Sequence, residues 1–280
     1  MPVREMALQK ALRPWLAAVL LLGAGLPNVL RAEPVAVRRV EGAVHGFLVL
    51  RSLDGKTIAY GDQLQVARGD RVTNRLTFHF KDGSLHDETA VFSQRKTFRF
   101  LSDHLVQKGP AFAHPMDVTV DGGSGRVSVR TTGDDGKEKR FDDRLKLPPD
   151  VANGMVLTLL KNLPRDARQL TVSMVVAAPK PRLVKLQVAA AGEVPFALAG
   201  SRRQATDYAI KVEIGGVAGV VAPLVGKQPP DTHTWVLGGE LPAFVKSEGP
   251  LFNGGPIWRI ELASPTWPEG EAAKAPARRR

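Results

Sequence analysis

Hydrophobic and polar residues alternate along most of this 280-residue chain. The clearest case is RVTNRLTFHF at 71–80, where every second residue from Val72 onward is apolar except Asn74. Because successive side chains of a strand point to opposite faces, this pattern predicts a half-buried antiparallel strand. The same alternation predicts further strands at 43–50, 96–108, 118–120, 127–129, 170–176, 183–190, 206–214 and 258–262.

Asp-Gly pairs punctuate the first half of the chain. Asp tolerates the left-handed backbone region and Gly favours it, so this dipeptide suits tight hairpin turns and predicts a meander of strands. Two pairs of adjacent acids, Asp134–Asp135 and Asp142–Asp143, are placed in or beside such turns and are not interpreted as a catalytic dyad. The four Asp-Gly pairs lie at 54–55, 82–83, 121–122 and 135–136.

One segment has helical spacing instead. After Pro-Pro-Asp at 148–150, apolar residues recur three and four positions apart through 151–162. Asp150 is expected to cap this helix and Pro164 to end it. A lone helix among strands must bury its apolar stripe against a sheet. We therefore predict a mainly β protein, a curved antiparallel sheet or half-barrel covered by one helix near 151–162.

The first 32 residues have the three-part pattern of a secretory signal peptide. Basic residues precede the apolar run Trp15–Leu26, and Ala32 offers a small residue for cleavage. A transmembrane helix needs about 20 apolar residues, more than this run has. Cleavage near Ala32 is favoured over an uncleaved anchor, which predicts a periplasmic or secreted protein without an integral membrane span.

The rest of the chain is predicted to be a single β-rich domain, 33–264. The sequence Pro-Lys-Pro at 179–181 separates two predicted strands and is the candidate boundary between two halves. From residue 265 onward Pro, Ala and charged residues replace any periodic pattern. Segment 265–280 is therefore predicted to be a disordered basic tail.

Composition removes several classes of function. The chain has no Cys, which excludes a disulfide scaffold, a thiol nucleophile and a lipid-anchored cysteine. Its formal net charge is +11, yet the basic residues are dispersed and the aromatics lie mostly on predicted apolar faces. This distribution does not favour nucleic-acid binding. Attraction to an anionic membrane surface is the more natural use of the charge.

Motifs for catalysis and metal binding are missing from the sequence. The six His residues do not pair at the spacings used for zinc, and no G-x-S-x-G occurs. No catalytic residue, metal site or cofactor is assigned, and the chain is not expected to be an enzyme. A hydrolase whose Ser, His and Asp meet only in the folded chain stays open as an alternative.

The most unusual stretch is the Gly-rich apolar run at 215–227. It favours a buried strand and turn, or else a segment that lines an apolar cavity. The segment that follows, 228–235, is expected to be a loop carrying a large aromatic. A concave sheet covered by one helix can leave a pocket unfilled. The candidate ligand-binding residues are Met155, Leu159, Val217, Val220, Leu224 and Trp235.

Two segments carry a resemblance to a known family. LPPDVANGMVLTLLKNL at 147–163, after a strand meander, and GGPIWRIEL at 254–262 resemble the bacterial domain-of-unknown-function 3108 family and related uncharacterised exported β-rich envelope proteins. The likeness spans 42–262. It implies a curved antiparallel sheet partly wrapped around a helix, similar in shape to periplasmic lipoprotein carriers, and it implies no catalytic residues. The run at 215–226 and the GKQPPDTHTW segment at 226–235 depart from the pattern.

These observations lead to a ranked set of functions. The first is an exported, non-enzymatic binding or carrier module for an apolar or amphipathic molecule of the cell envelope, such as a lipid. The alternative is a structural or interaction protein of the envelope whose apolar face is a solid core. The hydrolase is the third.

Overall fold

Antiparallel strands form nearly all of the fold, as the alternating sequence predicted. The computed structural model describes residues 34–133, 135–164, 167, 169–177, 180–198, 201–213 and 228–263, all within the unit Arg31–Arg280. The strands are β1 Val44–Ser52, β2 Thr57–Arg68, β3 Arg71–Phe80, β4 Leu85–Gln94, β5 Phe98–Lys108, β6 Met116–Asp121, β7 Arg126–Thr132, β8 Glu138–Arg144, β9 Gln169–Val176, β10 Arg182–Leu198, β11 Ser201–Glu213, β12 Thr232–Leu237, β13 Ala243–Pro250 and β14 Ile257–Leu262. The helix α1 spans Val156–Asn162.

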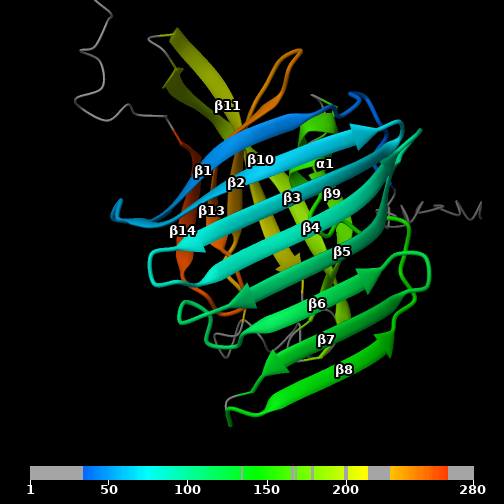
Figure 1. The fold of residues 1–280 in the computed structure, drawn as a ribbon. Helices are drawn as coiled ribbons and strands as arrows, with labels where there is room; N and C mark the ends of the chain where they lie inside the picture. Colours follow the sequence, from blue (N-terminus) through cyan, green and yellow to red (C-terminus); the bar gives the residue numbers. More distant parts are fainter. Residues whose placement is uncertain are drawn as a thin grey trace, which may run out of the picture. The chain divides into compact units, whose positions relative to one another are not determined.

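One 14-stranded sheet contains all of these strands. Its order is β8-β7-β6-β5-β4-β3-β2-β1-β14-β13-β12-β11-β10-β9, and every neighbouring pair is antiparallel. Figure 1 shows β1 to β8 side by side in this order. The sheet is not closed, because β8 and β9 stand at its two edges. The prediction of a mainly β fold with one helix is confirmed.

The hairpin turns are where the Asp-Gly pairs placed them. Gly55, Gly83 and Gly136 have φ angles of 91°, 85° and 71°, which is the left-handed region that glycine tolerates best. Between β6 and β7 the left-handed residue is Gly125 instead of Gly122. Asp-Gly pairs thus mark four of the seven connections within the meander β1–β8.

Strands without clean alternation escaped the sequence prediction, namely β2, β4, β8, β12 and β13. Asp142–Asp143 does not lie in a turn, because both residues belong to β8, where Asp142 pairs with Arg126 of β7. The segment 228–235 is not wholly a loop, since β12 begins at Thr232 and includes Trp235.

The helix begins later than predicted. Asp150 lies in a turn, and Val151 forms a parallel bridge with Ser173 of β9. Two backbone hydrogen bonds support the bridge, from Ser173 N to the Asp150 carbonyl at 3.1 Å and from Ala152 N to the Ser173 carbonyl at 2.9 Å. Asp150 is not the helix cap. Its carboxylate accepts hydrogen bonds from Ser173 Oγ at 3.0 Å and Lys185 Nζ at 3.1 Å.

Three apolar clusters form the core. The first joins α1 to strands from both ends of the chain, and the second packs aromatic residues of β3 and β14 around Phe112. The third brings valines of β6 and β7 against Val151 and Val175. Segment 150–152 therefore lies where the two ends of the strand order meet.

The segment between β8 and β9, called the crossover from here on, packs closely against the sheet at Gly154. The φ of Gly154 is +62°, and a Cβ atom there would overlap the Cβ of Ala90 on β4. Gly69, with φ +61°, has nothing within 4 Å of an added Cβ. An alanine substitution would cause backbone strain at both glycines but steric overlap only at Gly154, so comparing the two substitutions distinguishes the two costs.

We predict that Gly154→Ala lowers the free energy of unfolding by about 2–4 kcal/mol, because strain and overpacking add. The matched control Gly69→Ala carries strain alone and should lower it by about 1 kcal/mol. Urea denaturation of the two variants measures both values. Equal losses would mean that the crossover turn does not rest on β4.

Candidate functional site

Three of the six predicted ligand-binding residues fall within the structure. Met155 and Leu159 are 3% and 2% exposed and belong to the first core cluster, where they pack with Phe92 and Val172. They line only a small space, shared with Phe98 and Val172, that is too narrow to admit a water molecule. Val217, Val220 and Leu224 lie outside the described residues.

Trp235 lies on the opposite face of β12 from Val236, which belongs to the core. Lys246 Nζ stands 4.0 Å from the centroid of the Trp235 ring. The imidazole of His233 stacks on the same ring at 5.7 Å and is held by Asp207 at 3.0 Å. Trp235 is thus covered by polar neighbours on the outer face and does not face a ligand cavity.

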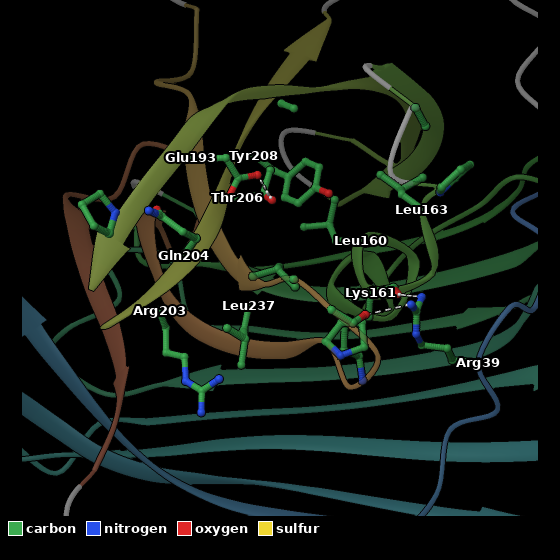
Figure 2. Close-up of a pocket in the computed structure, with 18 of the residues that line it drawn as sticks. Arg39, Leu160, Lys161, Leu163, Glu193, Arg203, Gln204, Thr206, Tyr208 and Leu237 are labelled. Carbon is green, nitrogen blue, oxygen red and sulfur yellow. Dashed lines mark hydrogen bonds between the residues drawn. The ribbon is translucent and has the colours of Figure 1, made fainter. Parts of the chain in front are cut away.

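A cleft of about 710 Å³ opens elsewhere, at the end of α1 (Figure 2). Its walls come from α1 and the residues after it, from the β10–β11 hairpin, from the β12–β13 turn and from the segment before β1. The lining residues are Arg39, Leu160, Lys161, Leu163, Pro164, Ala167, Ala190, Glu193, Pro195, Arg202, Arg203, Gln204, Thr206, Tyr208, Val236, Leu237, Gly238, Gly239 and Pro242.

The strand period explains which side chains of β11 face the cleft. Arg202, Gln204, Thr206 and Tyr208 are two positions apart, so they share one face. Figure 2 shows Tyr208 and Leu160 next to each other at the apolar side of the cleft. Burial raises the pKa of the Tyr208 hydroxyl, so the ring is neutral near pH 7.

A register shift in β10 directs the side chains of Glu193 and Pro195 toward the cleft. The shift lies between Ala190 and Gly192. Before it, Leu186 and Val188 point into the core, whereas after it Glu193 pairs with Thr206. A bulge of this kind re-aims side chains. The hairpin therefore changes from core strand to cleft wall within one long ribbon.

Hydrogen bonds of Arg39 connect three walls of the cleft. Its guanidinium donates hydrogen bonds to the backbone carbonyls of Lys161 at 3.1 Å, Gly239 at 3.0 Å and Glu240 at 3.1 Å. The Arg39 backbone N–H donates to Asn162 Oδ1 at 2.7 Å. The segment before β1 thus connects the end of α1 to the β12–β13 turn (Figure 2).

The positive charges of the cleft are not equally available. Lys161 Nζ is 2.6 Å from the carboxylate of Glu41, and both side chains are largely buried. Arg39 is occupied by carbonyls, and Glu193 accepts a hydrogen bond from Thr206 at 2.6 Å. Arg202 and Arg203 both line the cleft and are exposed, and neither has a carboxylate at ion-pair distance among the residues that the structure describes. These two arginines are therefore the cations available to meet an anionic ligand.

Neither Ser nor His is among the residues that line this cleft, so the Ser, His and Asp combination of the hydrolase alternative does not occur there. Over the described ranges, no group of three or more His, Asp or Glu side chains is arranged to hold a metal ion. No helix in the described part of the chain is both long and apolar enough to cross a membrane.

Sequence reasoning missed the cleft because its walls are remote in sequence. Arg39, Arg202 and Leu237 belong to segments that no local pattern connects. One signal was present: the alternation of the strand predicted at 183–190 stops at the residue where the bulge begins.

We predict that Arg39→Ala lowers the free energy of unfolding by about 1–3 kcal/mol, since three carbonyls lose a charged donor. The matched control is Arg38→Ala, which removes an exposed side chain with no hydrogen bond or ion pair to the described residues. Chemical denaturation of both variants gives the comparison. If Arg38→Ala costs as much, the guanidinium of Arg39 does not hold the walls.

Comparisons with known proteins leave the family open. No family model matches the chain, and no curated protein matches it. A solved structure that it resembles is a β-barrel-like protein of domain of unknown function DUF1849 from Brucella abortus, with 11% sequence identity and a TM-score of 0.44. The match covers 81% of this chain and 98% of that one. This is a different family from the one the sequence resembles, and both are uncharacterised and β-rich.

Proposed function

We propose that this protein is a non-enzymatic binding or carrier module whose ligand is an anionic amphipathic molecule of the cell envelope, held in the cleft at the end of α1. The observation that carries the proposal is the combination of apolar walls with an exposed arginine at one face. A cleft of about 710 Å³ lies within the range of small-molecule sites.

The two parts of such a ligand would meet different surfaces. An acyl or other apolar part fits against Leu160, Tyr208 and Leu237, where removal from water contributes about 25 cal/mol for each Å² of apolar surface. A carboxylate or phosphate fits beside Arg202, whose planar guanidinium binds such groups through two parallel hydrogen bonds. The cleft is open, so the charged part keeps contact with water.

Export is part of the same proposal. The basic, apolar and small-residue pattern of residues 1–32 supports transport out of the cytoplasm and cleavage near Ala32. An envelope location would bring the cleft to lipids and their fragments. Amino-terminal sequencing of the protein recovered from its native cell tests this directly, and Glu33 is the expected first residue.

We predict that 11-(dansylamino)undecanoic acid binds in the cleft and that Arg202→Ala weakens its binding about threefold to tenfold, as expected for one exposed charge contact. The methyl ester of the same probe lacks the carboxylate and should bind both proteins equally. Fluorescence titration measures the four dissociation constants. The matched control Lys211→Ala removes an exposed basic residue of β11 that does not line the cleft.

Equal effects of Arg202→Ala on acid and ester would reject a carboxylate contact. Absence of binding by both probes would favour the alternative function, a structural or interaction protein of the envelope. That alternative has its own support, since the helix face around Met155 and Leu159 is solid core. Organic extraction of the purified protein separates the two, because a carrier retains near-stoichiometric lipid and a structural protein retains none.

A further inference from the structure

Polar residues interrupt the inner face of the sheet between the first two core clusters. On β3, β4 and β5 the inner positions carry Phe78, Phe92 and Phe98 toward the clusters and polar side chains between them. Such a stripe costs stability unless its members are satisfied. The polar members are Asn74, His86, Glu88, Asp103 and Gln107.

His86 and Gln107 occupy one end of the stripe, and each is 2% exposed. Gln107 Nε2 donates to His86 Nδ1 at 3.1 Å and to the Leu251 carbonyl at 3.2 Å. His86 Nδ1 is therefore an acceptor, and the ring proton sits on Nε2, 4.0 Å from Glu88 Oε2. Burial lowers the pKa of His86 to about 4, so the ring is uncharged and does not neutralise Glu88.

Glu88 and Asp103 are diagonal neighbours on this face, because Glu88 pairs with Leu105 and Asp103 pairs with Ala90. The Glu88 side chain is 24% exposed, and its partial burial raises the pKa of the carboxyl to about 7. Burial and the charge of Glu88 together raise the pKa of Asp103 well above its usual range. In the described part of the chain, neither carboxylate has a Lys or Arg at ion-pair distance, and Asp103 Oδ1 has no hydrogen-bond partner.

The crossover turn before α1 sits directly on these two acids. A Cβ atom on Gly154 would lie 3.3 Å from Glu88 Oε1, and Asn74 Nδ2 donates to the Gly154 carbonyl at 3.3 Å. The side chain of Asn153 hydrogen-bonds the backbone of Val175 in β9, at 2.8 Å to the N–H and 2.9 Å to the carbonyl. Its nearness to Asp103 lowers the pKa of that carboxyl, an effect smaller than the burial that raises it. The turn thus connects the acids to an edge strand.

We propose that Glu88 and Asp103 form a proton-binding latch, in which the uncharged carboxyls allow the 153–155 turn to pack against β4 and β5 and so fix α1 as the wall of the cleft. When the pair ionises, two negative charges repel each other beneath the turn with no basic side chain to offset them. The turn then loosens from the sheet. The consequence for ligand binding rests on the proposed function.

The other charged groups near Glu88 and Asp103 form ion pairs with different residues. On the outer faces, Asp87 of β4 pairs with Arg75 of β3, and His104 of β5 pairs with Asp117 of β6. On the crossover, the carboxylate of Asp150 is bound by Lys185 and Ser173. The inner neighbours contributed by β6, Val118 and Val120, are uncharged, and the 250–252 loop contributes the Leu251 carbonyl.

The sign of the effect follows from the raised pKa of Glu88. Between the ordinary carboxyl range and about pH 7 the folded protein binds more protons than the unfolded chain. Stability is therefore greatest on the acid side of this window and is lost as pH rises through about 7. The equilibrium constant for folding should fall by up to about tenfold for each pH unit between about pH 5 and pH 7.

Hydrogen exchange tests the latch without any ligand. The amides of Ala152, Met155 and Leu159 are hydrogen-bonded in the crossover and α1, so their protection factors report on its docking. We expect these factors to fall at least about tenfold from pH 6 to pH 8 in the wild-type protein. Glu88→Gln keeps the shape without the charge and should abolish the change. Asp103→Asn should act in the same way and provides a second variant if the first folds poorly.

Asp87→Asn is the matched control, because it removes a neighbouring carboxylate on the outer face and should keep the wild-type pH response. A pH-independent protection in the wild-type protein, or an unchanged response in Glu88→Gln and Asp103→Asn, would overturn the latch. The dansyl probe provides a separate result. Its affinity should fall from pH 6 to pH 8 only where Glu88 is present, whereas Arg202→Ala should weaken it at both pH values. Failure of the probe to bind would reject the proposed function and leave the exchange test intact.

Discussion

The fold depends on the contact between Asp150–Ala152 and Ser173. An antiparallel meander needs only short turns between neighbours, but the step from β8 to β9 must connect the two edges of the sheet. The chain makes that step with a short piece hydrogen-bonded to β9, followed by α1. Both ends of this piece contribute contacts, since Val151 packs in the third apolar cluster, Ala152 in the first, and Asp150 Oδ2 binds Ser173 and Lys185.

The two edges are protected in different ways. An exposed edge strand is a template for pairing with another chain, and charge discourages that pairing. Strand β8 carries six charged residues in the sequence EKRFDDR. At the other edge, the piece 150–152 partly covers β9 and leaves it less exposed. An open sheet can therefore persist because one edge is charged and the other is covered by the crossover itself.

How much the sequence could predict depends on whether the information is local. The strand at 71–80 and the turn at 54–55 follow from neighbouring residues, and the structure has both. The helix start does not, because Val151 has the helical spacing but is drawn into a bridge with Ser173, 22 residues away. For Met155 and Leu159 the difficulty is different. An apolar stripe on a helix has the same pattern whether it meets a ligand or a sheet, so only the packed structure distinguishes the two.

The cleft and the buried acids share one structural element, which is the reason to consider them together. The turn at 153–155 lies over Glu88 and close to Asp103, and Leu160 and Lys161 of the seven-residue helix that follows it form part of the cleft wall. A carboxylate pair in an apolar interior lowers stability, and replacement by apolar residues of similar volume is commonly neutral or favourable. The pair lies beneath the crossover, which connects the two edges of the sheet. We therefore infer that binding or loss of a proton by either acid acts mainly on the packing of that crossover. A sheet with fourteen strands offers many places where buried acids would only weaken the core, and here they stand beneath the turn that leads into one wall of the cleft.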